Sequence, residues 1–172
     1  MDFFSVLSEC AITLAGFSAI YSILQGSTGP RGAYRSIATL STAGSAFFLS
    51  ILPLLVNQLE IPAPVLWSVC SAIAAFVRTL SLIIMWRIDG VLTDQGHPPQ
   101  MGRVVALNFL VGLISVVLFA VNIFYWPEST RQFLYGLGIV LMMITPVTAM
   151  GVAFFLLLEQ SLQDNVPEGS AK

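Results

Sequence analysis

Long uncharged stretches dominate the chain, and the polar and charged residues gather between them. Five intervals between charged positions are long enough to cross the hydrocarbon core of a bilayer, which takes about 20 apolar residues in a helix. None of them shows the alternation of polar and apolar residues that a barrel strand requires. The pattern therefore predicts transmembrane helices over residues 5–24, 37–59, 64–86, 104–125 and 132–158.

The composition agrees with an integral membrane protein. Of the 172 residues, 56% are hydrophobic and only 9% are charged, whereas soluble domains carry roughly 25% charged residues. The predicted fold class is all-α, a polytopic membrane helix bundle that forms one domain over residues 1–163 and ends in a flexible cytoplasmic tail over residues 164–172. The Gly and Pro content of residues 87–103 predicts a loop there.

The placement of basic residues predicts the orientation in the membrane. With five spans, only Arg131 falls on one side, so we expect the N-terminus outside and the C-terminus inside. The alternative is a first segment that lies flat in the interface, because residues 5–24 are the most polar span and include Glu9. The basic residues on the inner side are Arg31, Arg35, Arg87, Arg103 and Lys172.

Glu9 is a carboxylate at the head of an otherwise uncharged span, where burial in hydrocarbon requires water, a cation or a partner. Helical spacing places Ser5, Glu9 and Gly16 on one face, with Thr13 at its border. We therefore expect Glu9 to look into the protein or its oligomer axis, where these four residues would line a pathway or bind a cation. The simpler interpretation is an acid that the helix dipole favours and headgroup water solvates.

Arg78 is the second charge inside a predicted span. Its position two turns before Trp86 lets it reach toward the inner interface. We expect a structural ion pair with Glu159 in preference to Asp89; the other interpretation is a role in gating or anion contact. Asn108 and Asn122 are expected to form hydrogen bonds between helices.

Small residues and prolines punctuate the spans. Residues 36–46 are rich in Ser, Ala, Thr and Gly, which predicts burial against neighbouring helices. Pro53 and Pro146 predict helix kinks, and Pro53 removes the donor that the carbonyl of Leu49 would accept from. Leu-Ala-Gly-Phe at residues 14–17 and Leu-Val-Gly-Leu at residues 110–113 form a weak internal echo, which indicates either an inverted repeat or chance.

Catalytic and metal-binding patterns are absent from the sequence. His97 is the only histidine and has no ligand spacing around it, so no metal site or cofactor is expected. Cys10 and Cys70 are expected to be free, buried thiols. Nucleic-acid binding is not expected either, because the net charge is −2 and the basic residues are dispersed. The chain is not expected to be an enzyme.

The segment ECAITLAGFSAI, residues 9–20, resembles the first helix of uncharacterised small bacterial multi-span membrane proteins. The resemblance rests on Glu9 followed six residues later by Ala15-Gly16-Phe17. It implies a multi-pass protein of the bacterial inner membrane and implies no activity. The segment is also similar to the first helix of Orai-type calcium channels, which carries an acid at its outer end. Those channels have four spans and a cytoplasmic N-terminus, so their mechanism is not carried over.

The function predicted from these features is a homo-oligomeric ion channel or small transporter with the acidic site on the first helix. The bilayer, further copies of the chain and a cation are the expected partners. The alternative is a non-conducting structural or regulatory subunit that binds another membrane protein through the Ala- and Ser-rich faces of the second and third spans. A third hypothesis, a lipid-modifying enzyme, requires a polar cavity open to one leaflet.

Overall fold

The computed structural model describes residues 2–25, 29–97, 102–124 and 126–164, and these residues form five α-helices. All five are long and apolar enough to cross a membrane, which confirms the predicted number of apolar helices within the described residues. The predicted tail from residue 165 on lies outside them. The helices are α1 Asp2–Gln25, α2 Pro30–Asn57, α3 Ala63–Asp94, α4 Gly102–Asn122 and α5 Glu128–Asp164.

The extent of α3 corrects the sequence prediction. The loop expected from residue 87 is helical up to Asp94. Gly96 lies two residues past the end of the helix, and its φ of 83° is a conformation that glycine adopts without strain. The Gly96 amide donates to the Thr93 carbonyl at 3.0 Å and the His97 amide to the Leu92 carbonyl at 2.9 Å, the bonding pattern of a Schellman cap. The glycine marks the end of the helix, and the polar residues before it do not.

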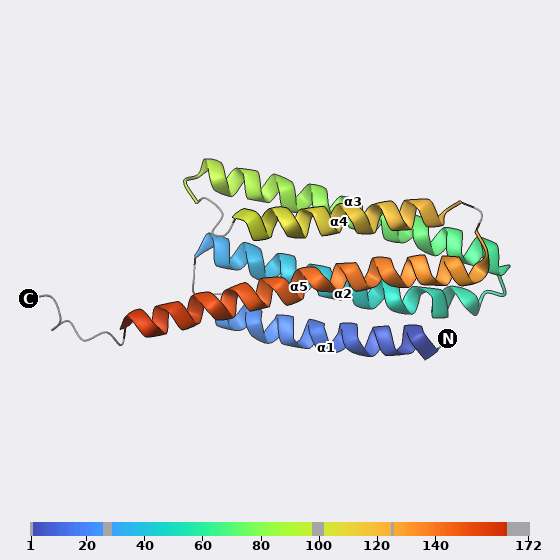
Figure 1. Cartoon of the computed structure of the whole chain (residues 1–172), viewed down its shortest axis with the longest axis horizontal. Helices are drawn as coiled ribbons and strands as arrows, with labels where there is room; N and C mark the ends of the chain where they lie inside the picture. Colours follow the sequence, from blue (N-terminus) through green and yellow to red (C-terminus); the bar gives the residue numbers. More distant parts are fainter. Residues whose placement is uncertain (1, 26–28, 98–101, 125, 165–172) are drawn as a thin grey trace, which may run out of the picture.

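Helices α2, α3, α4 and α5 form a ring in which each helix packs against the next (Figure 1). Helix α1 packs from outside against α2 and α5. We call the end of the bundle where α1, α3 and α5 begin the Trp67 end, and the opposite end, where α1, α3 and α5 finish, the Trp86 end. The last part of α5 extends past the other helices at the Trp86 end (Figure 1). The direction in which the bundle crosses a bilayer stays a prediction.

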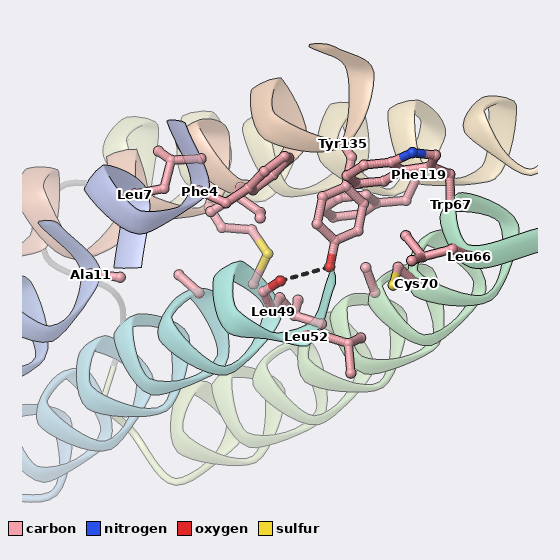
Figure 2. Close-up of a cluster of buried hydrophobic side chains, with 14 residues drawn as sticks. Phe4, Leu7, Ala11, Leu49, Leu52, Leu66, Trp67, Cys70, Phe119 and Tyr135 are labelled. Atoms are coloured by element: carbon pink, nitrogen blue, oxygen red, sulfur yellow. Dashed lines mark hydrogen bonds between the residues drawn. The ribbon is translucent and has the colours of Figure 1, made fainter. Parts of the chain in front are cut away.

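Aromatic rings close the Trp67 half of the bundle. Phe4, Trp67, Phe119 and Tyr135 are buried, and the centroid of the Tyr135 ring lies 5.5–5.9 Å from those of the other three (Figure 2). Gly138 allows this packing, since a Cβ there would lie 2.5 Å from Cε1 of Phe119. The rings come from four different helices, so they join α1, α3, α4 and α5 in one core.

The predicted burial of the small residues of α2 is confirmed in part, because Ser41 and Gly44 within the same stretch are exposed. Ser36, Thr39, Thr42, Ala43 and Ala46 are all buried inside the bundle. The hydroxyl of Thr39 donates to the carbonyl of Arg35 at 2.7 Å and that of Thr42 to the carbonyl of Ala38 at 2.8 Å. These hydroxyls therefore find acceptors on their own helix, and the small side chains leave room for neighbouring backbones.

Neither proline breaks its helix. Pro53 and Pro146 are both buried within uninterrupted helices. Pro53 leaves the carbonyl of Leu49 without its usual helical donor, and the hydroxyl of Tyr135 donates to that carbonyl at 2.7 Å (Figure 2). A side chain of α5 thus completes the hydrogen bonding of α2 at the point where the sequence removes a backbone donor.

Replacing Tyr135 by Phe should lower the free energy of unfolding by about 1 kcal/mol, because the Leu49 carbonyl loses its donor. Unfolding in mixed micelles titrated with SDS and followed by circular dichroism measures this. In a Pro53→Ala background the new amide at position 53 can serve Leu49, so the same Tyr135→Phe change should have a clearly smaller effect. Equal effects in both backgrounds would show that the bond does not compensate for the proline.

Candidate functional site

The four pathway residues predicted on α1 lie on the side that faces away from the other helices. Ser5, Glu9, Thr13 and Gly16 are all exposed, and a Cβ at Gly16 would meet no atom within 4 Å. Glu9 therefore does not look into its own chain, which corrects one of its two expected positions; the oligomer axis stays a prediction. The buried side of α1 consists of Phe4, Leu7, Ala11, Ser18 and Tyr21.

Metal and disulfide chemistry are not found in the described part of the chain. Among those residues no group of three His, Cys, Asp or Glu side chains is placed to hold a metal ion. Cys10 and Cys70 are both free thiols, as predicted, but only Cys70 is buried; the expected burial of Cys10 is wrong, because it lies on an exposed part of α1.

Arg78 lies deeper than the sequence suggested. Because α3 runs from Ala63 to Asp94, Arg78 is 15 residues from one end and 16 from the other (78 − 63 and 94 − 78). That places it about 23 Å from the nearer end of the helix. Its side chain is 1% exposed. This guanidinium is therefore buried inside the bundle near the middle of α3.

The expected Arg78–Glu159 ion pair stays a prediction, because the side chain of Glu159 lies outside the described residues. The backbone does not favour the pair. The Arg78 guanidinium reaches Thr145 on α5, and Glu159 is 14 residues (159 − 145) further along the same helix, a distance of about 21 Å. Asp89, the other acid considered for Arg78, pairs with Arg31 instead.

A cavity of about 390 Å³ lies between α2, α3, α4 and α5 in the Trp86 half of the bundle. Arg78, Thr145 and Asn108 line its deep end, and Tyr34 and Asp89 line it near the helix ends. Most of the wall between these two levels is formed by apolar side chains of α3, α4 and α5. The ring of four helices is thus filled by aromatic side chains in one half and hollow in the other.

Arg78 has hydrogen-bond donors without partners among the described residues at the deep end of this cavity. Its Nη2 donates to the hydroxyl of Thr145 over a long 3.4 Å, and its Nε and Nη1 are buried without a hydrogen-bond partner among the described residues. Gly112 makes room for the group, since a Cβ there would lie 2.9 Å from Nη2. A buried cation with unused donors is energetically unfavourable unless an anion or water meets it.

Arg131, the other deeply buried arginine, is bonded quite differently. At 2% exposure, its Nη1 donates to the carbonyl of Pro64 and to the hydroxyl of Ser68 at 3.1 Å, and its Nη2 donates to the carbonyl of Phe124 at 2.6 Å. These acceptors belong to the start of α3 and the segment just after α4. Arg131 therefore joins three helix ends at the Trp67 end, which is a structural role.

A polar cluster between α2 and α3 lies beside the cavity near the helix ends, where Tyr34 and Asp89 line it. Arg31 pairs with Asp89, and its Nη2 and Nε donate to the Thr93 hydroxyl at 2.8 Å and the His97 carbonyl at 2.6 Å. The hydroxyl of Tyr34 donates to the Met85 carbonyl at 3.0 Å. The charge of Asp89 is thus already matched, so it does not compete for Arg78.

The two predicted interhelical asparagines are confirmed as hydrogen-bonding residues: Asn122 donates to Ser71 at 2.8 Å, and Asn108 accepts from Thr148 at 2.8 Å.

The sequence places Arg131 at a membrane surface and does not reveal the cavity. The one signal for the cavity is the set of polar residues Arg78, Asn108 and Thr145, which stand in three different spans. Their chain positions alone do not show that they meet.

Comparison with protein-family models, with curated proteins and with solved structures finds no match for this chain. The resemblance of residues 9–20 to small bacterial membrane proteins therefore stays a prediction. The functional argument rests on the geometry of the chain itself.

The two buried arginines should respond oppositely to replacement by methionine. Arg131→Met should lower the free energy of unfolding by about 3 kcal/mol, because several carbonyl and hydroxyl groups lose their donor. Arg78→Met should leave it unchanged or raise it by about 1 kcal/mol, because a buried charge with unused donors is removed. SDS-titrated unfolding of both variants measures the difference, and an equal loss in both would mean that Arg78 is a structural residue.

Proposed function

We propose that the chain is a small membrane transporter that binds an anion at Arg78, inside each subunit. The observation that carries this proposal is the one-sided cavity that ends at a guanidinium with unused donors near the middle of α3. Transporters commonly bind their substrates near the bilayer midplane, in cavities between helices, and expose the site to one side at a time.

The charge of the site favours an anion. Arg78 is buried at the deep end, and the one carboxylate among the described residues that line the cavity is Asp89, which is paired with Arg31. A guanidinium presents donors in a geometry that suits carboxylate, sulfonate or phosphate oxygens. A cation at this position would meet a like charge, so the cation predicted from Glu9 does not fit this cavity.

The closed half of the bundle favours a transporter over an open channel. Beyond Arg78, the path through the ring is filled by Met142, Phe119 and Tyr135, each 0% exposed. A molecule that enters at the Trp86 end therefore stops at Arg78 until helices move. The proposal keeps a transporter, one of the two functions predicted from the sequence. It differs from that prediction in placing the binding site in the ring of α2, α3, α4 and α5 and not on α1.

Proteoliposomes test the proposal. Anion efflux should be measured with chloride, inorganic phosphate and benzenesulfonate as probes, with valinomycin and K⁺ present to balance charge. At least one probe should leave faster than from protein-free vesicles, and Arg78→Gln should slow that efflux at least about tenfold, since a charge-assisted hydrogen bond is lost. Glu9→Gln should leave anion efflux unchanged. Efflux of no probe, or efflux that Arg78→Gln leaves intact, would remove the proposal.

A second candidate is the predicted cation pathway between copies of the chain. It is favoured by the exposure of the carboxylate of Glu9, with Ser5 and Thr13, on the outward side of α1, where contact with lipid alone would be unfavourable. A homo-oligomer that assembles through this side of α1 would give Glu9 the partner or the cation that it needs.

Mass measurement in detergent and K⁺ flux in proteoliposomes test this second candidate. Glu9→Gln should reduce K⁺ flux several-fold, whereas Glu60→Gln, a change at an exposed acid between α2 and α3, should have no effect. A monomeric mass, or K⁺ flux equal in the two variants, would leave the outward side of α1 as a lipid-facing surface.

The alternative of a non-conducting subunit keeps only part of the surface that the sequence suggested for it. The small residues on the inner side of α2 are buried within the bundle, and Ser71 and Ala74 of α3 are buried as well. Ser41 and Gly44 of α2 and Ala72 of α3 are exposed, so these positions are the ones left exposed to meet another membrane protein.

A further inference from the structure

We propose that the ligand of the cavity is an amphipathic monoanion, with one carboxylate or sulfonate group on an apolar body. This inference rests on the anion transport proposed above and names the class of substrate. It follows from the charge at the deep end of the cavity, from the polar groups beside it, and from the size and lining of the remaining space.

The charge of the site matches one negative charge. Arg78 is the one ionisable residue among the described residues that line the deep end, because Arg35 and Asp89 lie near the helix ends. A monoanion at Arg78 makes a neutral pair, whereas a dianion would leave one unmatched charge far from water. Inorganic phosphate, which is partly dianionic at neutral pH, is therefore disfavoured.

The donors and acceptors beside Arg78 fit an oxyanion head. Nε and Nη1 of Arg78 have no partner among the described residues, so they are free to donate to oxygen atoms. Asn108 accepts from the hydroxyl of Thr148 through its Oδ1 at 2.8 Å, which leaves its amide nitrogen as a further donor. The hydroxyl of Thr145 lies 3.4 Å from Nη2. A carboxylate or sulfonate accepts several such bonds at once.

The cavity as a whole is too large and too apolar to suit an inorganic anion. Its volume of about 390 Å³ equals that of about 13 water molecules at ~30 Å³ each and falls in the range of cavities that enclose small organic ligands. An apolar body on the ligand would contact the walls and exclude water from the ion pair. The apolar wall includes Leu82, Met85, Trp86, Val105, Phe109 and Val152.

Two sources can supply this chemistry: a water-soluble organic acid and a single-chain fatty acid from the bilayer. Both present one oxyanion and an apolar body. They differ in length and in route of entry, so the experiment includes one probe of each kind.

Binding to the purified protein in lipid nanodiscs tests the inference without any flux measurement. Isothermal titration calorimetry with benzenesulfonate, palmitate, inorganic phosphate and chloride gives the affinities. Benzenesulfonate or palmitate should bind at least about tenfold more tightly than either inorganic anion, and Arg78→Gln should weaken that binding at least about tenfold. Tryptophan fluorescence should change on binding, and Trp86→Phe should abolish the change.

Two further variants separate the ligand contact from a general loss of structure. Arg78→Lys keeps the charge but loses the planar array of donors, so binding should fall to a level between wild type and Arg78→Gln. Gly112→Ala keeps Arg78 but crowds its guanidinium, because the added Cβ would lie 2.7 Å from Cδ2 of Leu82 and 2.9 Å from Nη2 of Arg78; binding should weaken while unfolding by SDS stays cooperative.

The outcomes are distinct. Tight, Arg78-dependent binding of benzenesulfonate supports the inference with a soluble ligand, and the same result for palmitate supports it with a lipid source. Equal binding of phosphate or chloride overturns the ligand class but leaves anion transport standing. Binding that Arg78→Gln does not change, or no binding of any probe, overturns the inference, and the efflux measurement then decides separately on the proposed function.

Discussion

Hydrocarbon offers no hydrogen-bond partner, and this constraint accounts for much of the structure. The carbonyl of Leu49, freed by Pro53, is served by Tyr135 from another helix. Asn122 is fixed by Ser71 and by the carbonyl of Arg131. The buried hydroxyls of Thr39 and Thr42 bond to carbonyls of their own helix. In each case a polar group that the sequence places inside the bundle is matched by a partner, so polar contacts hold the helices in register where apolar packing alone would let them slide.

The same constraint separates the two halves of the bundle. At the Trp67 end, aromatic rings and the bonded guanidinium of Arg131 leave a filled interior. At the Trp86 end, the Arg31–Asp89 pair ties α2 to α3 near the helix ends, and the space below that pair is open down to Arg78. A filled half beside a hollow half is the arrangement that the proposed transport requires, in which binding and release alternate around one site.

Several elements could be predicted from the sequence because they depend on local chemistry. The number of spans follows from the lengths of the apolar stretches, and the need of Leu49 for a new donor follows from Pro53 alone. The small residues at positions 36–46 indicated a buried face on α2, which Thr39, Thr42, Ala43 and Ala46 help to form, although Gly44 faces outward. The C-terminal end of α3 could also be predicted, because Gly96 can supply the positive φ of a helix cap. The polar residues before Gly96 predict a loop, but they belong to the helix.

The rotation of α1 could not be predicted, for a physical reason. In water, the apolar side of a helix is the packed side, but in a bilayer both sides are apolar and the pattern no longer distinguishes them. Ala11 faces the bundle with 0% exposure, whereas Ile12 faces outward with 54% exposure. The sequence therefore placed Glu9 on a small-residue face without showing whether that face meets the same chain.

Gly16 and Gly112 show why the weak internal echo does not predict a shared role. Both stand in similar apolar sequence, yet a Cβ at Gly16 would meet open space while one at Gly112 would meet Leu82 and Arg78. The role of a glycine in a membrane helix depends on what the neighbouring helix brings to it. At Gly112 the neighbour brings a guanidinium, and the missing side chain is what lets that charge lie beside α4 at the deep end of the cavity. The charge on which the proposed function rests is thus given its place by a glycine, a residue without a side chain.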